Sequence, residues 1–190
     1  RLLARTRFDP GLQFAIANQF YLIATNQEAD FARIHHAMTF GYDRAGQFPT
    51  AGFAAGPCLL KDTMQLSALQ QNGFLLGHAA MLINEGLPNA IVNALKHDLR
   101  SDLRGMRVGI LGMTFKADVD DIRDSLSYKL AKILRFHGAR VVCSDEYVRN
   151  DSFVPAATVV DTCPVVIVGV PHRAYHHLAV PPQTHLVDLW

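Results

Sequence analysis

Apolar residues in the first forty positions recur every three or four residues, and a polar stretch at residues 25–28 divides them into two groups. These apolar positions are Leu12, Ile16, Phe20, Ile23, Phe31, Ile34 and Met38. A period of 3.6 predicts two amphipathic helices, whose apolar stripes are typical of a core or a dimer interface. The sequence Asp-Pro-Gly at residues 9–11 predicts a break before the first helix.

Three further helices are predicted over residues 64–71, 74–85 and 88–99. Asp62 and Thr63 are N-cap candidates for the first of them, and Asn72 with the following glycine marks its end. Pro88 would begin the last helix, because the first helical residue needs no amide donor. The first half of the chain is therefore expected to be all-helical.

The period changes after residue 101. Short apolar runs at residues 106–112, 140–143, 164–170 and 185–189 alternate with helical patterns at 125–136 and 174–178. Strands that alternate with helices predict βαβ units and a parallel sheet. We therefore expect an α then α/β fold, with a helical domain over residues 1–101 and a small Rossmann-like domain over residues 102–190.

Composition narrows the class of protein. The 190 residues are 49% hydrophobic, and 18 basic against 17 acidic residues give a net charge of +1, so we expect no nucleic-acid partner. No apolar run reaches the roughly 18 residues that span a membrane. Three cysteines without a CxxC pair favour a reducing cytoplasm, and nine histidines without metal-ligand spacing predict no metal. Because the chain starts without methionine, we expect an N-terminal part to be missing.

The strongest candidate chemistry lies in residues 52–62. Small residues at 52 and 54–56 let the backbone approach a ligand closely. Cys58 would then lie just before a helix, where the helix dipole and the ammonium of Lys61 favour the thiolate. Asp62 lies four residues after Cys58 and is a candidate general base. A lone cysteine in an apolar chain is also typical of a small buried hydrophobe, so both interpretations stand.

Three cations are candidates for binding phosphate, and each has a simpler interpretation. Arg44 lies in the loop over residues 41–56 and either holds a phosphate or is solvated. Lys116 and Arg123 flank the acidic residues 118–121, and they either form surface ion pairs or offer cations to a nucleotide diphosphate at the sheet edge. The turn at residues 109–112 lacks the GxGxxG spacing of a dinucleotide site.

Two segments resemble motifs of the UDP-glucose/GDP-mannose dehydrogenase family. AGPCLLKD at residues 55–62 is similar to GGxCLPKD, and GMTFKADVDDIRDSLS at residues 112–127 is similar to GxxFKxx(T/D)DDxRxSxS. The resemblance covers nearly all of the chain. It implies a central helical domain that forms a homodimer and a C-terminal Rossmann-like domain that binds UDP-sugar or a related nucleotide-sugar. The family's N-terminal NAD-binding domain has no counterpart in these residues.

The resemblance also implies roles for single residues. Cys58 matches the catalytic nucleophile and Asp62 its acid/base partner, while Lys61 and Arg123 match positions near NAD. The residues matched to substrate binding are Phe53, Gly56, Phe115 and Lys116, and we add Arg44 as a candidate. Leu60 replaces the usual proline, and the family's KLxxN motif has no counterpart.

The reaction implied by the resemblance converts the sugar C6 alcohol to a carboxylate. Two hydrides pass to NAD, through a thiohemiacetal and a thioester on Cys58. Asp62 would activate the water that hydrolyses the thioester. The alternative is a non-catalytic, dimerising module that binds a nucleotide-sugar and lacks the NAD domain.

Overall fold

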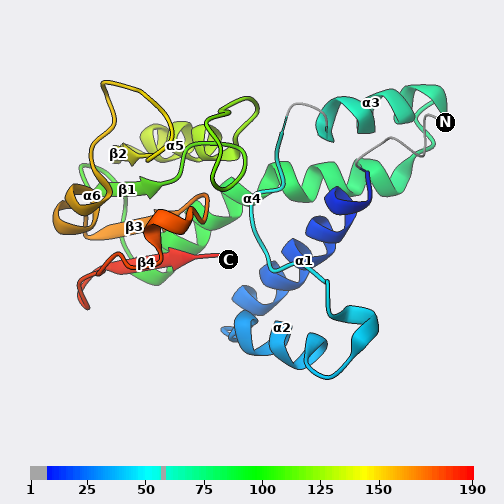
Figure 1. The fold of residues 1–190 in the computed structure, drawn as a ribbon, viewed down its shortest axis with the longest axis horizontal. Coiled ribbons are helices and arrows are strands. Elements are labelled where there is room, and N and C mark those ends of the chain that lie inside the picture. The colour runs from blue at the N-terminus through cyan, green and yellow to red at the C-terminus, as the bar shows by residue number, and fades with distance from the viewer. Residues whose placement is uncertain (1–7, 57–58) are drawn as a thin grey trace. The chain divides into compact units, whose positions relative to one another are not determined.

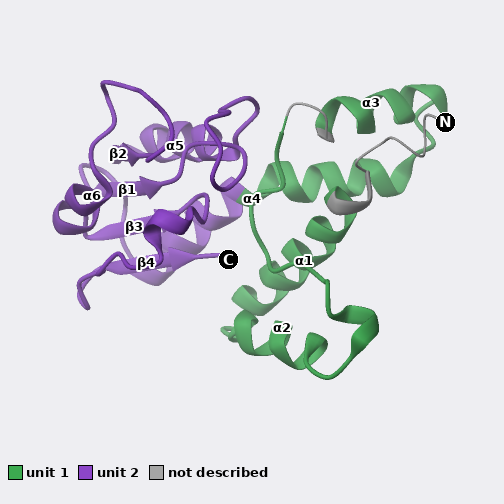
Figure 2. Ribbon diagram, in the orientation of Figure 1, with its two compact units in different colours: residues 1–87 green, residues 88–190 purple. Residues whose placement is uncertain are grey.

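The structure, a computed structural model, describes residues 8–56 and 59–190. The chain forms two compact units, residues 1–87 and residues 88–190 (Figure 2). Their boundary falls at Pro88, inside the helix α4 (Leu75–Leu99). The predicted division at residues 101/102 follows the end of this helix and stays a prediction.

Unit 1, residues 1–87, is helical as expected (Figure 1). Besides the first part of α4 it contains α1 (Phe8–Asn26), α2 (Phe31–Thr39), the short η1 (Asp43–Ala45) and α3 (Leu59–Leu69). The two amphipathic helices predicted from the spacing are confirmed. The break predicted at residues 9–11 is wrong, because α1 already includes Pro10. Proline is tolerated there, since amides of the first helical turn have no intrahelical acceptor.

Two helix boundaries in unit 1 also differ from the prediction. Helix α3 begins at Leu59, so Asp62 lies in its first turn and is not its N-cap. Its end agrees with the sequence, since Asn72 adopts a left-handed φ of 64° and its amide donates to the Ser67 carbonyl over 2.8 Å. The helices predicted over residues 74–85 and 88–99 form the single helix α4. Pro88 has no amide hydrogen, so that helix lacks one backbone hydrogen bond. The helix is 25 residues long and continues through this position.

Unit 2, residues 88–190, is built on a four-stranded parallel sheet. Its strands are β1 (Arg107–Leu111), β2 (Arg140–Ser144), β3 (Val165–Val168) and β4 (His185–Asp188), in the order β2-β1-β3-β4 (Figure 1). The helix predicted after β1 is α5 (Leu126–Phe136), and the predicted turn of helix before β4 is the shorter η2 (Arg173–Tyr175). The α then α/β fold is confirmed.

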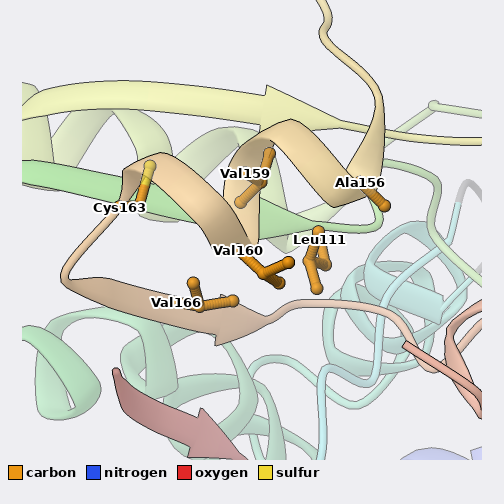
Figure 3. Close-up of a cluster of buried hydrophobic side chains, with 6 residues drawn as sticks. All are labelled: Leu111, Ala156, Val159, Val160, Cys163 and Val166. Carbon is orange, nitrogen blue, oxygen red and sulfur yellow. The ribbon is translucent and has the colours of Figure 1, made fainter. Parts of the chain in front are cut away.

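The sequence analysis missed α6 (Ala156–Thr162). Its β-branched residues lower helix propensity, but burial of one face outweighs that preference. Ala156, Val159 and Val160 are buried against Leu111 and Val166 of the sheet (Figure 3). The spacing of these helix residues, with Cys163 following, was the available signal.

Helices α5 and α6 cover opposite faces of the sheet. A Cβ atom on Gly109 would collide with Val159 of α6, whereas Ile110 lies on the side where Gly169 meets Ser127 of α5. Successive residues of a strand point to opposite faces, so the two helices enclose the sheet. Both faces of the central strand β1 are therefore buried, and ligands can reach only its ends.

Candidate functional site

The strand order places a topological switch point at the carboxyl ends of β1 and β3. The chain runs from β1 out to β2 and then returns past β1 to β3. The connection that follows β1 leads to β2 and the one that follows β3 leads to β4, so the two connections run in opposite directions. Ligands of open parallel sheets bind at such a switch point, outside the carboxyl ends of the strands. The segments that follow β1 and β3 are the place where a site is expected.

The two strands end in close contact at this point. The amides of Gly169 and Val170 both donate to the carbonyl of Leu111, over 2.8 and 3.2 Å. Gly112 has a φ of +86°, and a Cβ atom there would lie 2.6 Å from the Val170 carbonyl oxygen. Glycine is therefore required where the loop after β1 leaves the sheet.

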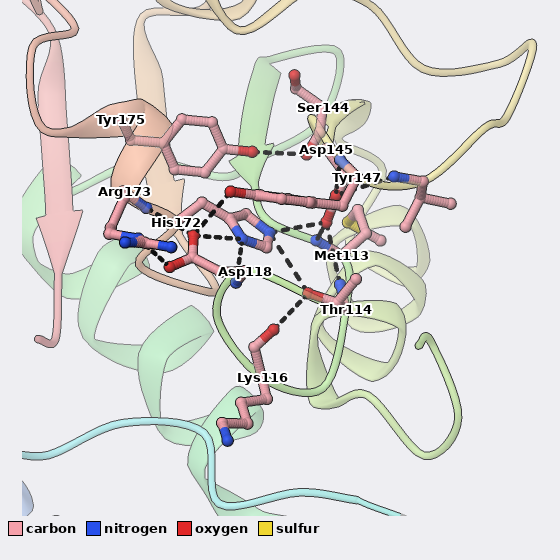
Figure 4. Close-up of polar contacts among 11 residues, drawn as sticks. Met113, Thr114, Lys116, Asp118, Ser144, Asp145, Tyr147, His172, Arg173 and Tyr175 are labelled. Carbon is pink, nitrogen blue, oxygen red and sulfur yellow. Dashed lines mark hydrogen bonds and ion pairs between the residues drawn. The ribbon is translucent and has the colours of Figure 1, made fainter. Parts of the chain in front are cut away.

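The carboxylate of Asp145, which follows β2, holds the start of that loop (Figure 4). Its Oδ2 accepts from the amides of Met113 and Thr114 over 2.6 and 3.1 Å. Its Oδ1 accepts from the amides of Tyr147 and Val148 over 2.8 and 3.2 Å. Burial opposes ionisation of Asp145, but hydrogen bonds from His172, Met113 and Tyr147 outweigh it and lower the pKa of the carboxyl.

His172, which follows β3, is fully buried beside Asp145. Its Nε2 lies 3.1 Å from Asp145 Oδ2, and its Nδ1 accepts from the Asp118 amide over 2.9 Å. Because Nδ1 is the acceptor, the ring proton is on Nε2 and is donated to Asp145. The rings of Tyr147 and Tyr175 lie against the imidazole, with centroids 4.8 and 5.3 Å away.

The carboxylate of Asp118 closes this network on the solvent side (Figure 4). It accepts from the Arg173 amide over 3.0 Å, from Arg173 Nε over 2.6 Å and from the Tyr147 hydroxyl over 2.9 Å. These bonds, the Arg173 amide foremost, lower the pKa of Asp118 to about 2. The hydrogen bond to Asp118 also raises the pKa of the Tyr147 hydroxyl.

The predicted nucleotide-sugar residues lie on the loop held by this network. Phe115 is partly buried, and its amide donates to the Asp121 carbonyl over 3.0 Å. Lys116 is exposed, and its ammonium points away from the network (Figure 4). Arg123 forms an ion pair with the Asp121 carboxylate, with Nη2 2.6 Å from Oδ2. The surface-pair interpretation thus holds for Arg123, whereas no ion pair of Lys116 is found within the described residues.

In unit 1 a buried pair of asparagines holds the small-residue loop. Asn18 on α1 accepts from the Gly52 amide over 2.9 Å and donates to the Gly52 carbonyl over 3.0 Å. It also donates to Asn84 of α4 over 3.0 Å. The loop is therefore fixed to the helices at Gly52. Phe53 is buried, with 4% of its surface exposed, and Gly56 has a φ of 133° that favours glycine.

Of the remaining predicted residues of unit 1, two lie side by side and one lies apart from them in sequence. Cys58 lies outside the described residues. Lys61 Nζ and Asp62 Oδ1 are 4.0 Å apart at the start of α3, with Lys61 60% exposed. Arg44 is exposed in η1. The catalytic, cofactor and substrate roles of all these residues stay predictions.

Four residues of the network in unit 2 were missed as functional candidates. They are Asp145, Tyr147, His172 and Arg173. Each follows the carboxyl end of β2 or β3 within five residues, which is where a parallel sheet places its ligand-facing side chains. Their positions relative to the predicted strands were the signal.

The described part of the chain offers neither a cluster of metal ligands nor a membrane-spanning helix. No group of three histidine, cysteine, aspartate or glutamate side chains there is arranged to hold a metal ion. None of the described helices is long and apolar enough to cross a membrane.

A helical unit followed by a four-stranded parallel sheet with a switch point between β1 and β3 defines a protein with a Rossmann-like domain. Residues 109–188 match the model of the UDP-glucose/GDP-mannose dehydrogenase family, UDP binding domain. Residues 109–188 therefore belong to this family, and the resemblance stated from the motifs is confirmed.

Known proteins similar to the chain carry the names of nucleotide-sugar dehydrogenases. The UDP-glucose 6-dehydrogenase AglM of Haloferax volcanii is 32% identical over 70% of this chain and 31% of its own length. The UDP-N-acetyl-D-mannosamine dehydrogenase of Methanocaldococcus jannaschii is 28% identical over 79% of this chain and 34% of its own. The solved UDP-glucose dehydrogenase of Pyrobaculum islandicum has a TM-score of 0.80 at 27% identity, covering 94% of this chain and 44% of that one. The chain therefore spans about a third to half of these proteins' lengths.

Proposed function

We propose that this chain is the central and substrate-binding part of a nucleotide-sugar 6-dehydrogenase of the UDP-glucose type. The observation that carries the proposal is the loop after β1. It leaves the sheet at the switch point, is held by hydrogen bonds from the amides of Thr114 and Asp118, and carries Phe115 and an exposed Lys116 between them. An aromatic ring and a free ammonium on a fixed loop suit a nucleotide with its phosphates.

The sugar would be met by the loop of unit 1. Gly52 is anchored by Asn18, and the following small residues leave room for a hydroxylated ring beside the backbone. Phe53 is buried, so its proposed part is to shape this loop and not to present a large open face. Arg44 is exposed and is proposed as an additional contact to phosphate.

The proposed chemistry uses Cys58 and Asp62. Loss of a hydride and a proton turns the C6 alcohol into an aldehyde, and the Cys58 thiolate adds to its carbonyl carbon. Loss of a second hydride from this thiohemiacetal gives a thioester. Asp62 takes a proton from the attacking water, and hydrolysis releases the carboxylate and the thiol.

The oxidant proposed for both hydride transfers is NAD. Lys61 and Arg123 are exposed by 60% and 70%, and their charges suit the phosphates of a dinucleotide. The chain contains no G-x-G sequence, so these residues can supply only part of such a site. When bound, NAD accepts the hydride, and the part of this chain is to hold the sugar carbon and the thiol in place.

We further propose that unit 1 forms a homodimer in the cytoplasm. Ile16, Phe20 and Ile23 lie on one face of α1 and are 47%, 41% and 50% exposed. An apolar face of this kind is typically covered by a partner, and a second copy of the chain is the proposed one. Sedimentation of the chain and of a Phe20→Glu variant tests this: the dimer should dissociate in the variant, and a monomeric parent chain would contradict it.

The test of substrate binding is isothermal titration of the chain with UDP-glucose, UDP, GDP-mannose and NAD in turn. We expect UDP-glucose to bind, NAD to bind weakly, and Lys116→Ala to weaken UDP-glucose binding by about tenfold, the cost of one charged hydrogen bond. The matched control is Lys132→Ala on the exposed surface of α5, which should leave the affinity unchanged.

Two results would contradict the proposal. If none of the nucleotides binds, the family motifs persist here only as a scaffold. If UDP-glucose binds equally to the Lys116→Ala variant and to the parent chain, the loop after β1 is not the substrate contact.

A further inference from the structure

The loop segment that carries Phe115 and Lys116 is attached at two points, and both attachments meet at one imidazole. At Thr114 the amide donates to Asp145 Oδ2, to which His172 Nε2 also donates. At Asp118 the amide donates to His172 Nδ1 over 2.9 Å. Residues 115–117 therefore form an arch whose ends are set by the two nitrogen atoms of His172.

The direction of each hydrogen bond in the arch is fixed. The Thr114 hydroxyl donates to the Lys116 carbonyl over 2.8 Å, so its oxygen is free to accept from His172 Nε2 at 3.3 Å. Asp145 can only accept, and the Asp118 amide can only donate. A neutral imidazole with its proton on Nε2 is the arrangement that satisfies all of these groups.

The far end of the arch is also held from outside. Asp118 has a left-handed φ of 58°, and its carboxylate is bound by Tyr147 and Arg173. The amide of Asp118 is thus aimed at His172 by its own side chain. Movement of the imidazole would shift Lys116 directly, because only Ala117 lies between Lys116 and this anchor.

We propose that His172 is a positioning residue for the nucleotide-sugar, which acts by holding the arch that presents Phe115 and Lys116. This inference rests on the proposed function. His172 itself is fully buried and does not touch the ligand. Its contribution to affinity should pass entirely through residues 115–117.

Three variants distinguish the contributions of the two nitrogen atoms of His172. His172→Asn places an acceptor near the position of Nδ1 and should keep the Asp118 anchor. His172→Gln places a donor near Nε2 and loses that anchor, and His172→Leu loses both contacts. His177→Asn, at an exposed position on the same segment, is the matched control.

Titration with UDP-glucose measures the effect on the site. We expect His172→Gln and His172→Leu to weaken binding by about tenfold or more, and His172→Asn and the control by less than about threefold. In a Lys116→Ala chain, His172→Leu should add less than about threefold, because the two residues act through one contact. The proposal would be overturned if the losses of affinity from Lys116→Ala and His172→Leu added in full. It would also be overturned if His172→Asn and His172→Gln weakened binding equally.

Hydrogen exchange of the Asp118 amide in the ligand-free chain separates this inference from the proposed function. We expect exchange to be at least about tenfold faster in the Gln and Leu variants and unchanged in the Asn variant. Unchanged exchange in all three would overturn the anchor, even if UDP-glucose binds. Absence of binding to the parent chain would overturn the proposed function and, with it, the positioning role, whatever the exchange rates show.

Discussion

His172 Nε2 lies 3.1 Å from Asp145 Oδ2, and neither side chain is exposed to solvent. The imidazole follows β3 and the carboxylate follows β2, so the contact passes over the end of β1, which lies between these strands. The same carboxylate accepts hydrogen bonds from the amides of Met113 and Thr114, which begin the loop after β1. One ion-dipole contact thus ties together the three strand ends at the switch point.

Breaking this contact should destabilise unit 2. In the parent chain, backbone amides donate hydrogen bonds to both carboxylate oxygens of Asp145. Asp145→Asn keeps only one of these oxygens, so the amides that donated to the other must face the new NH2 group, which cannot accept them. We expect the free energy of unfolding to fall by about 3 kcal/mol. Urea titration followed by fluorescence of the single tryptophan, Trp190 in unit 2, measures it.

The control for that measurement is Asp161→Asn, an exposed position near the end of α6. Its effect on the unfolding free energy should stay within about 0.5 kcal/mol. A loss in the Asp145→Asn variant no larger than this would show that the network does not stabilise the strand ends.

Acid should weaken unit 2 through Asp118. The pKa of this carboxyl is lowered to about 2 in the folded chain, against about 3.9 when unfolded, so its ionised form stabilises the fold. That contribution is present above about pH 4 and is lost as the pH falls towards 2. The pKa of Asp121 and of Asp145 is lowered as well, so their contributions are lost in the same direction.

The measurement is the urea midpoint of Trp190 fluorescence between pH 2 and pH 6. Asp118→Asn should flatten the decline in the acid range, while Asp161→Asn should leave it as in the parent chain. Asparagine tolerates the left-handed backbone of residue 118, so the variant tests the charge and not the turn. An unchanged pH profile would contradict the lowered pKa of Asp118.

Thiol labelling tests whether Cys58 is reactive. Cys143 and Cys163 are buried, 6% and 3% exposed, and burial raises the pKa of the Cys143 thiol. Because the thiolate is the reactive form, both should react slowly in the folded chain. We expect iodoacetamide at neutral pH to label one cysteine quickly and all three in urea.

The Cys58→Ser variant should lose the fast reaction, whereas Cys163→Ala should keep it. UDP-glucose should slow the labelling if Cys58 faces the sugar as proposed. Fast labelling that persists in Cys58→Ser would mean that the reactive thiol is another one.

The order of helices and strands could be predicted from the sequence because their apolar periods are long and distinct. Helix α6 and the run of α4 through Pro88 were missed, because tertiary packing there outweighs the local preference on which the prediction relied. Arg123 was ambiguous for another reason: residue types fix a charge, but only the fold shows that Asp121 is its partner.

The network around His172 shows the same limit at the site. Its members come from three separate strand ends, so no single stretch of sequence contains the pattern. The motif at residues 112–127 indicated where a ligand would bind but not what holds the loop. Contacts between distant segments had to come from the structure.

Gly112 gives a test of how tightly the segments after β1 and β3 are packed together. At φ +86° an alanine costs about 1–2 kcal/mol for backbone strain alone. Its Cβ atom would also lie 2.6 Å from both Cβ and the carbonyl oxygen of Val170. Val170 cannot move away without breaking the hydrogen bonds that its segment donates to the Leu111 carbonyl. We therefore expect Gly112→Ala to lower the free energy of unfolding by about 2–4 kcal/mol.

Gly105→Ala is the matched control, because Gly105 has a φ of +75° but no atom within 4 Å of an added Cβ. It should show only the backbone part, about 1–2 kcal/mol. The difference between the two variants, measured by urea titration, is then the cost of pushing the segments after β1 and β3 apart. Equal losses would mean that the Val170 segment yields freely, and that the segments after β1 and β3 are not held rigidly together at the switch point.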